Sequence, residues 1–536
     1  MEINALPFDT LPFSALFKHL INEQKDAVAL FEFPLFEADQ ALSHFSFKGD
    51  RTQITQLISR FNESFDASTE TLKNIERLRL PDSVCVVTGQ QLAIFGGPVY
   101  TLYKIISTIA LARRLEQHHQ RPVIPVFWLA DEDHDIDETV NVQLIQKGSN
   151  STHTYSDPHS LPIPVADRIL SDEIDPFLNE VFDHLETTPF THTLREQLQQ
   201  AYQPGATFRR AFGKLIMQWF GKYGLVLAGS NDPEIKAWLQ PVLKTAVQEA
   251  DTVYKALEGQ THKVEIAFKR QAQISDSLLF YLDPEANKAR YRIKHEQGAW
   301  FTEQGHRWST AELIDLVDRF PQHVSPNVFF RPMLQDHLLP TLAYVAGPGE
   351  LAYYAQMNQL YRVFGLHMPL ITPRHSATIL DASVTRNLHQ LPFTFQDYQL
   401  RKEDLEKTYI TQHQSINADQ WALDWIELLR TASESAIAQL SSSEPTLRAS
   451  AEKTLAETEA SITKIKQKWI KSLKEKEQTA LQRIQRVKNT CFPEQEPQER
   501  VISTIYFLNK FGMEVIDELL NTFQEHKADH HYLIHL

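Results

Sequence analysis

The chain has 536 residues, of which 42% are hydrophobic and 23% charged, and these proportions are typical of a globular protein with two or three compact units. Its 53 Lys and Arg against 68 Asp and Glu give a net charge of −15, which argues against general nucleic-acid binding. No apolar run approaches the ~20 residues of a membrane helix, and the N-terminus is not typical of a signal peptide. Cys85 and Cys491 form neither a disulfide framework nor a zinc pattern. We therefore expect a soluble, cytoplasmic protein.

A strand, a glycine-rich loop and a helix are predicted between residues 84 and 115. The apolar run 84–87 predicts a buried strand, and Pro98 stands where a helix tolerates proline, at its start. Glycines permit close backbone approach and helix starts attract anions, so this segment is a candidate phosphate or carboxylate site. A tight turn with glutamines that bond the backbone is an equally open alternative, since neither a Walker A loop nor GxGxxG is present. The candidate binding residues are Gly89, Gln90, Gln91, Gly96, Gly97 and Lys104.

A second predicted strand, 123–129, ends in a dense acidic run: Asp131, Glu132, Asp133, His134 and Asp135. Neighbouring carboxylates raise one another's pKa unless a cation balances them. The cation could be a divalent metal, a substrate ammonium group, or nearby Arg and Lys, and oxygen ligands suit Mg²⁺ better than zinc. Asp131 and Asp133 are thus candidate catalytic residues and Mg²⁺ ligands, and His134 is a candidate general base. Alternatively, Asp131 caps a helix and the others are solvated.

Later predicted strands, 225–228, 342–346 and 368–371, are also followed by polar loops. Ligands of parallel α/β sheets collect beyond the carboxyl ends of the strands, and arginine presents a planar fork to carboxylates and phosphates. The competing interpretation is that the arginines form structural ion pairs with the acidic loop. The candidate binding residues here are Asn327, Arg331, Gln335, Asp336, Gly347, Gly349, Glu350 and Arg374.

The repeated order of strand, loop and helix predicts an α/β fold with a parallel sheet. After about residue 380 no convincing strand is predicted, and the closing HHYLIHL is too weak a pattern for a metal site. The expected parts are an N-terminal part of the core at 1–150, a first insertion at 151–221, core at 222–250, a second insertion at 251–324, core at 325–380, a helical arm at 381–497 and a return to the core at 498–536.

The arm is predicted from residues 446–488, which contain no Pro or Gly and carry apolar residues at steps of three and four. A continuous helix of these 43 residues would be about 65 Å long, at ~1.5 Å per residue. Apolar residues from Trp421 to Leu440 predict a partner helix. The two helices together are expected to form an antiparallel coiled coil. We expect the apolar face to mediate homodimerisation, whereas the basic face could be a solvated surface.

Four stretches resemble the BshC family, which is assigned to cysteine addition in bacillithiol biosynthesis: GQQLAIFGGPVYTLYK, PVFWLADEDHDIDE, SPNVFFRPMLQDHLLPTLAYVAGPGELAYYAQ and FPEQEPQERV. The resemblance implies a Rossmann-like core with two insertions, similar to connecting peptides, and a coiled-coil arm. It also implies a ligase that joins L-cysteine to glucosaminyl-malate through an amide bond. Because amide formation from a free carboxylate is uphill in water, activation by ATP with Mg²⁺ is a chemical expectation, although no HIGH- or KMSKS-type signature supports it.

Under this hypothesis the glycine loop and Lys104 hold an anionic group, and Asp131 and Asp133 hold a cation. His134 removes a proton from the attacking amine, while Arg331 and Arg374 bind malate or phosphate. Two other functions stay open. One is a metal-dependent transferase or hydrolase that uses the acidic loop 131–138, and the other is a non-catalytic coiled-coil scaffold.

Overall fold

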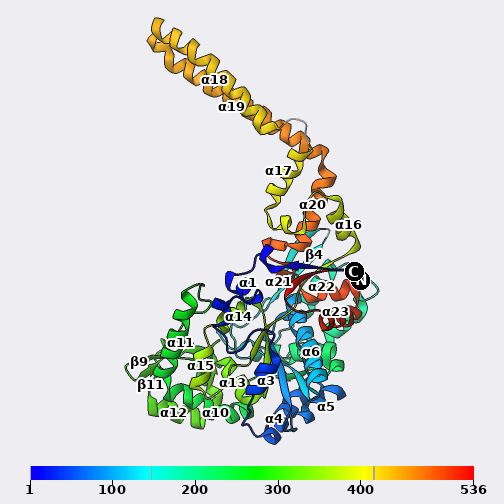
Figure 1. The fold of residues 1–536 in the computed structure, drawn as a ribbon, viewed down its shortest axis with the longest axis vertical. Coiled ribbons are helices and arrows are strands. Elements are labelled where there is room, and N and C mark those ends of the chain that lie inside the picture. Colours follow the sequence, from blue (N-terminus) through cyan, green and yellow to red (C-terminus); the bar gives the residue numbers. More distant parts are fainter. Residues whose placement is uncertain (1, 147, 414–416) are drawn as a thin grey trace. The chain divides into compact units, whose positions relative to one another are not determined.

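The computed structural model describes residues 2–146, 148–413 and 417–536 and contains two compact units (Figure 1). The first unit is formed by Met1–Ile379 together with Pro497–Leu536, and the second by Leu380–Glu496. Within the described part of the chain, no helix combines the length and the apolar character needed to cross a bilayer.

A parallel sheet of five strands forms the centre of the first unit, which confirms the predicted α/β fold. Its order is β14-β13-β2-β3-β6, and every residue of β3 is buried, as expected for a parallel strand covered on both faces. In register, Val87 of β2 lies beside both Val126 and Tyr344, so the carboxyl ends of these strands lie at one edge. The strands are β2 (Val84–Gln90), β3 (Val123–Leu129), β6 (Val226–Ala228), β13 (Thr341–Ala346) and β14 (Leu370–Pro373).

The crossover from β2 to β3 is the long helix α6 (Val99–His119), which begins directly after Pro98. It is buried on most of its circumference because the sheet and the C-terminal helices both pack against it. Those helices are α21 (Gln498–Val501), α22 (Thr504–Phe511) and α23 (Glu514–Glu525). Gly512, at a positive φ, separates α22 from α23.

The N-terminal segment is mostly helical, and its helices begin at residues that accept backbone amides. Ser14, Asp50 and Ser68 are such N-caps. The helices are α1 (Ala15–Ile21), α2 (Lys25–Val28), α3 (Ala38–His44), α4 (Arg51–Glu63) and α5 (Thr69–Arg77).

The two ends of the chain are joined in a second sheet of order β1-β16-β15. β1 (Glu2–Pro7) runs antiparallel to β16 (His530–His535), and β15 is Ser376–Leu380. The prediction that no strand follows residue 380 is therefore wrong for β16. The histidines of HHYLIH obscured the strand pattern, although the buried His531 is an interior residue of this sheet.

The two stretches expected as insertions have their own small structures. The first contains β4 (Asn141–Gln146), β5 (Ser149–Thr154), α7 (Ile174–His184), α8 (Thr191–Ala201) and α9 (Phe208–Phe220). Between it and the second lies α10 (Pro233–Gln248), which Asp232 caps. The second contains α11 (Ala250–Glu265), the sheet β12-β7-β8 (Val324–Pro326, Leu279–Asp283, Ala289–Arg292) and α12 (Thr310–Arg319).

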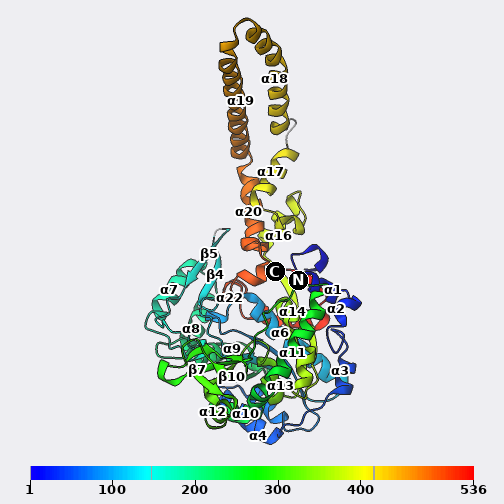
Figure 2. The same ribbon diagram turned by 90° about the vertical axis from the view of Figure 1, so that its left-hand side faces the viewer.

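The second unit is helical and contains an antiparallel pair of long helices, α18 and α19 (Figure 2). The ring of Trp421 contacts that of Trp469, and Arg430 pairs with Glu459 at 2.6 Å. The continuous helix predicted over 446–488 is divided at Glu477 into α19 and α20. The helices are α16 (Ala382–Gln390), α17 (Lys402–Gln412), α18 (Ala418–Ser443), α19 (Arg448–Lys476) and α20 (Gln478–Cys491).

Two buried histidines anchor the C-terminal strand and its neighbours. His375 lies 2.9 Å from the Ser107 hydroxyl, and the two ring nitrogens of His531 lie 2.8 Å and 2.9 Å from the hydroxyls of Ser376 and Thr378. Burial lowers the pKa of His375 to about 3 and that of His531 to about 4, so both are neutral in the folded protein.

We predict that these two histidines lower the free energy of unfolding as the pH falls below about 6.5, because their imidazoles then bind protons in the unfolded chain only. The carboxyl groups of Asp131 and Asp336, whose pKa burial raises to about 7 and about 6, act in the opposite direction. Each histidine should remove about 2 kcal/mol between pH 7 and pH 5, above the range in which most carboxylates titrate. Denaturant midpoints measured across this range test it. Between pH 7 and pH 5 the variant His531→Gln should lose about 2 kcal/mol less stability than the unchanged protein, whatever its absolute stability. An equal change in the two proteins would contradict the prediction.

Candidate functional site

A polar cavity of about 760 Å³ lies at the carboxyl edge of the central sheet. The loops after β2, β3 and β13 line it, together with residues of the second insertion and Arg374. Predicted site residues from distant parts of the chain therefore meet in one cavity: Gly89, Gln90, Gln91, Lys104, Asp131, Asp133, Asn327, Arg331, Gly347, Gly349, Glu350 and Arg374. Five others lie outside it: Gly96, Gly97, His134, Gln335 and Asp336.

Lys104 connects two of the loops that form the cavity. Its ammonium group donates to the carbonyl of Gly89 at 2.7 Å and to Oε1 of Gln90 at 2.9 Å, and it forms a buried ion pair with Glu350. Glu350 also accepts the Tyr344 hydroxyl at 2.8 Å and the Gly347 amide at 2.7 Å. Burial lowers the pKa of Lys104, and the Glu350 carboxylate opposes this effect. The charge of Lys104 is thus largely committed to the loops themselves.

Two arginines of the cavity have opposite surroundings. Arg374 makes two hydrogen bonds, of 2.8 Å and 2.9 Å, to the carboxylate of Glu499, and both residues are buried. It is therefore in a structural ion pair, with a partner outside the acidic loop. Among the residues that the structure describes, no carboxylate forms an ion pair with Arg331, which contacts Gln335 at 2.9 Å. Its guanidinium lies 5.4 Å from the ring centre of Tyr344.

The acidic loop lines the cavity with Asp131, Glu132 and Asp133, of which the first two are buried. Asp131 accepts the backbone amides of Ser230 and Asn231 at 3.2 Å, and burial together with Glu132 raises its pKa to about 7. Glu132 pairs with the buried Lys236 at 2.6 Å. The protein thus supplies a cation for this part of the loop, one of the three possibilities that the sequence allowed.

The side chain of Asp133 is more exposed, and its carboxylate accepts the side-chain amide of Gln91 at 2.8 Å. Arg290 lies 3.8 Å from its carboxylate. Among the described residues, Asp131 and Asp133 are not part of a cluster of three metal-ligating groups. A Mg²⁺ ion held by these two carboxylates would therefore need further oxygen ligands, such as substrate phosphates.

His134 lies beside the cavity rather than in it, and lines a neighbouring cavity of about 640 Å³. Its Nδ1 accepts a hydrogen bond of 2.8 Å from Arg290, and burial and the Arg290 charge lower its pKa. The ring is therefore neutral near pH 7, and its acceptor nitrogen is already occupied. This geometry does not favour the predicted role of general base, which requires a free acceptor nitrogen.

Gly96 and Gly97 lie away from the cavity, where the chain packs tightly. A Cβ at Gly96 would lie 2.7 Å from the Trp219 ring, and one at Gly97 would lie 2.7 Å from the Cβ of Ala93. Their amides bond the carbonyls of Ala93 and Ile94, and the Val99 amide bonds Ile502. These amides are consequently not available to an anion, in contrast to the predicted anion site at the start of α6.

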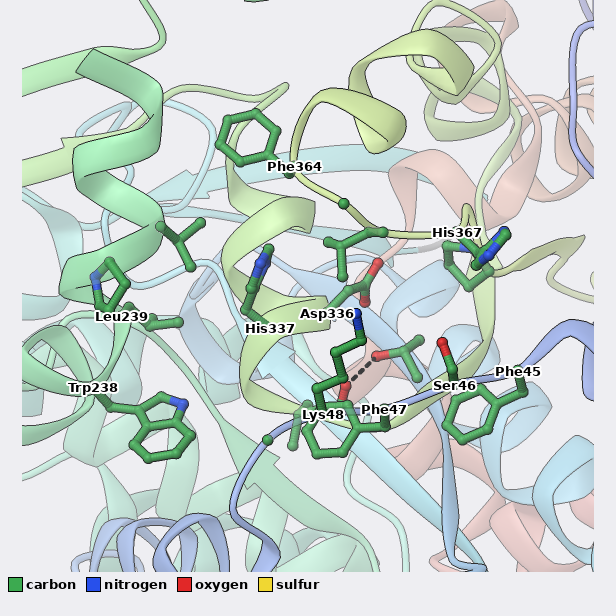
Figure 3. Close-up of a pocket in the computed structure, with 18 of the residues that line it drawn as sticks. Phe45, Ser46, Phe47, Lys48, Trp238, Leu239, Asp336, His337, Phe364 and His367 are labelled. Atoms are coloured by element: carbon green, nitrogen blue, oxygen red, sulfur yellow. Dashed lines mark hydrogen bonds between the residues drawn. The ribbon is translucent and has the colours of Figure 1, made fainter. Parts of the chain in front are cut away.

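A second cavity, of about 860 Å³, opens near the amino ends of β13 and β14 and is lined largely by apolar groups (Figure 3). Figure 3 shows the rings of Phe47, Trp238 and Phe364 around it. The predicted residue Asp336 lines this cavity, and its carboxylate accepts bonds of 2.9 Å from Gln335 and Tyr361. Gln335 bonds both Asp336 and Arg331, so it positions the arginine of the polar cavity without lining it.

Several residues of the polar cavity were not identified from the sequence. Arg290 and Arg292 come from β8, in the stretch 251–324 that was expected only as an insertion. Arg500 follows Glu499 in FPEQEPQERV, a stretch that carried the family resemblance without an assigned role. The other lining residues that were missed include Tyr100, Ser230, Gln271, Gln273, Tyr344 and Tyr353.

The fold and the cavity define a Rossmann-like α/β protein with a polar site where such sheets bind ligands. Two family models together cover the chain: "Bacillithiol biosynthesis BshC, N-terminal Rossmann-like domain" over residues 1–375, and "Bacillithiol biosynthesis BshC, C-terminal coiled-coil domain" over residues 377–536. The chain therefore belongs to the BshC family of bacillithiol biosynthesis.

Similar curated proteins carry the name "Putative cysteine ligase BshC". The protein of Chlorobaculum tepidum is 30% identical, with 91% of this chain and 89% of the relative covered. That of Salinibacter ruber is 30% identical, with 90% and 88% covered. That of Bacillus licheniformis is 31% identical, with 88% of each chain covered.

We predict that Gly96→Ala lowers the thermal unfolding midpoint more than Gly205→Ala does. Both glycines have positive φ, at +88° and +81°, so both substitutions introduce backbone strain. Only at Gly96 does the added methyl also collide with a ring, because a Cβ at Gly205 would have none of the described atoms within 4 Å. The strain alone costs about 1 kcal/mol, and equal midpoints for the two variants would show that Trp219 adapts without cost.

Proposed function

We propose that the protein is a ligase that joins the carboxyl group of L-cysteine to the amine of glucosaminyl-malate, the last step of bacillithiol biosynthesis. Membership of the BshC family and the names of its relatives support this proposal. The structural observation that carries it is the presence of opposite charges in one cavity: Arg331 has no carboxylate partner among the described residues, and Asp131 and Asp133 lie on the loop after β3. Malate brings carboxylates, and both substrates bring amines.

The bond formed is C–N, and one oxygen of the cysteine carboxylate leaves. This condensation is uphill in water, so the carboxylate must first be activated. We propose ATP with Mg²⁺ as the activating pair, with the leaving oxygen transferred to phosphate. Asp133 and the nucleotide phosphates would hold the ion, which leaves the Asp131 carboxylate free to act as a base. This part of the proposal rests on chemical need, because the chain has no nucleotide-binding signature.

Arg331 is proposed to bind a malate carboxylate through its planar fork. Gln335 and the surrounding tyrosines fix the orientation of the guanidinium. Asp131 is proposed to take the proton from the attacking amine, because it lines the cavity and burial places its pKa near 7, where a general base is most effective.

The direct test mixes purified protein with L-cysteine, glucosaminyl-malate, ATP and Mg²⁺, and detects the condensed thiol by mass spectrometry. A parallel reaction omits ATP. Product that forms only with ATP supports both the ligase activity and the activation by ATP. Product that forms without ATP supports the ligase activity and contradicts the activation by ATP. If the unchanged protein neither forms product nor binds glucosaminyl-malate, the proposed substrate is wrong.

We predict that Arg331→Lys raises the KM for glucosaminyl-malate at least about tenfold, because an ammonium group cannot reproduce the bidentate fork. Its thermal midpoint should stay close to that of the unchanged protein. Arg374→Gln provides the contrast, since it leaves the buried Glu499 unpaired and should cost about 3–5 kcal/mol of stability. A KM unaffected by Arg331→Lys would exclude this residue from substrate binding.

We predict that Asp131→Asn reduces kcat about 100-fold or more, the usual contribution of a general base. His134→Gln should change kcat only a few-fold, because the imidazole already accepts a hydrogen bond from Arg290. Steady-state kinetics of the two variants decide between the residues. The reverse order, with His134→Gln inactive and Asp131→Asn active, would restore the role first predicted for the histidine.

We also propose that the helical arm mediates homodimerisation. Leu423, Trp425, Leu428 and Ile465 are between 42% and 73% exposed on α18 and α19, which is a large apolar surface for a solvated helix pair. Leu428→Glu is predicted to shift the chain from dimer to monomer in light scattering coupled to size-exclusion chromatography. Ser435→Glu, on an exposed residue of the same helix, is the control. A monomeric unchanged protein would refute the proposal.

A further inference from the structure

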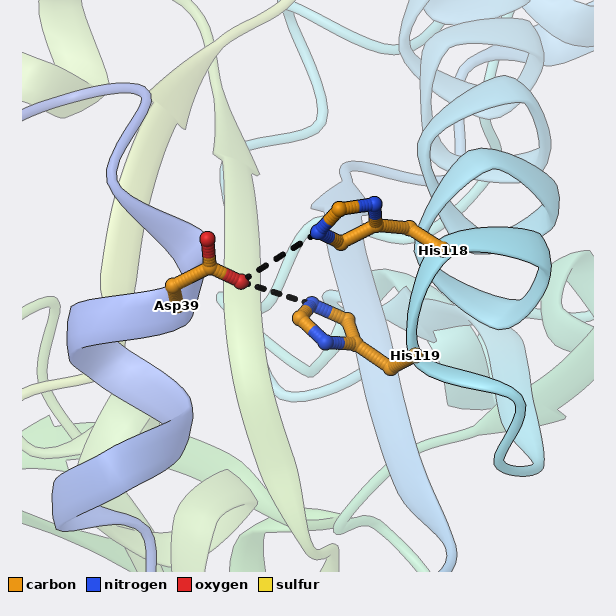
Figure 4. A group of neighbouring side chains, drawn as sticks. All are labelled: Asp39, His118 and His119. Carbon is orange, nitrogen blue, oxygen red and sulfur yellow. Dashed lines mark ion pairs between the residues drawn. The ribbon is translucent and has the colours of Figure 1, made fainter.

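Three side chains able to bind a metal converge at the end of α6, on the first compact unit (Figure 4). His118 and His119 are the last two residues of that helix, and Asp39 lies in the first turn of α3. Figure 4 shows both imidazole rings turned toward the same carboxylate oxygen. None of the three residues lines the polar cavity.

The spacing of the donor atoms suits a metal better than direct pairing. Nε2 of His118 and Nε2 of His119 each lie 3.5 Å from Oδ1 of Asp39. Ligands at the usual zinc distances in a tetrahedron are separated from one another by about 3.4 Å. A direct N–H···O hydrogen bond would be shorter, typically about 2.9 Å. The two distances to Asp39 match those between neighbouring ligands of a coordinated ion, and all three donor atoms lie within 4.8 Å of one another.

The buried nitrogen of His119 points the same way. Its side chain is 11% exposed, and its Nε2 is buried without a hydrogen-bond partner among the described residues. The imidazole faces the Asp39 carboxylate at 3.5 Å, beyond the usual hydrogen-bond distance, so neither group satisfies the other directly. A cation would satisfy both groups at once, and the C-terminus of a long helix also favours positive charge.

We propose that Asp39, His118 and His119 bind one divalent transition-metal ion through two imidazole nitrogens and one carboxylate oxygen. Zn²⁺ fits this donor set best, and the exposure of Asp39 and His118, 74% and 66%, leaves room for water as a fourth ligand. The ion would tie α3 to the end of α6. Because Ala41 and His44 of α3 line the apolar cavity of Figure 3, the same ion would hold one wall of that cavity. The site is separate from the proposed ligase chemistry.

The test uses the full-length chain without a histidine tag, stripped of metal by a chelator and titrated with Zn²⁺ against a chromophoric chelator. We expect saturable binding of one ion per chain, and a visible Co²⁺ spectrum typical of tetrahedral coordination. Asp39→Asn and His118→Gln should each weaken Zn²⁺ binding at least about tenfold. Both positions are exposed, so these variants should fold. His192→Gln removes an exposed histidine elsewhere, on α8, and should bind as the unchanged protein does.

A second readout is thermal unfolding. Zn²⁺ should raise the midpoint of the unchanged protein and of His192→Gln, and should have less effect on Asp39→Asn and His118→Gln, because an ion that binds only the folded chain stabilises it. The proposal is overturned if Zn²⁺ shows no saturable binding, or if Asp39→Asn and His118→Gln bind it as tightly as the unchanged chain.

Discussion

The buried ammonium group of Lys104 is the contact on which the cavity depends. It bonds the Gly89 carbonyl at the end of β2 and pairs with Glu350 after β13, so it joins segments that are far apart in sequence. A buried charge is costly unless it is paired and hydrogen-bonded, and here the carboxylate, a carbonyl and a side-chain amide share that task. Lys104 thereby holds the end of β2 and the segment after β13 together at the carboxyl edge of the sheet, and these segments carry several of the polar groups of the cavity.

Charge compensation then divides the polar residues into two groups. Glu132 pairs with Lys236, and Arg374 pairs with Glu499, so these residues stabilise the walls of the cavity. The guanidinium of Arg331 instead donates to the neutral side-chain amide of Gln335, one turn further along the same helix, and has no carboxylate partner among the described residues.

Like Arg331, Asp131 has a side chain that is not in an ion pair with another described residue. It is buried against the backbone amides of Ser230 and Asn231, and its pKa lies near neutrality. The cavity thus contains Arg331, which has no carboxylate partner among the described residues, and the carboxyl group of Asp131, whose pKa lies near 7. This combination suits the joining of an anionic substrate to an amine.

The family models and the arrangement of the strands agree on a Rossmann-like fold. The BshC family models cover the Rossmann-like unit and the helical unit in turn. The sheet independently places its polar cavity at the carboxyl ends of its strands, where parallel α/β sheets bind ligands. The cluster of Asp39, His118 and His119 lies apart from that cavity and involves the N-terminal helices, which the sequence patterns did not connect with any function.

The sequence by itself determined the parallel α/β core and the antiparallel helices, because hydrophobic periodicity, glycine loops and proline positions are local signals. It also indicated the polar loops, since those follow the strands directly. Only the tertiary structure decided which side chains were already paired: Arg374 with Glu499, His134 with Arg290, and the amides around Gly97 with neighbouring carbonyls. Most of those partners are far apart in the sequence, and they come into contact and become buried only when the chain folds. The strand β16 was likewise determined by its pairing with β1, at the opposite end of the chain.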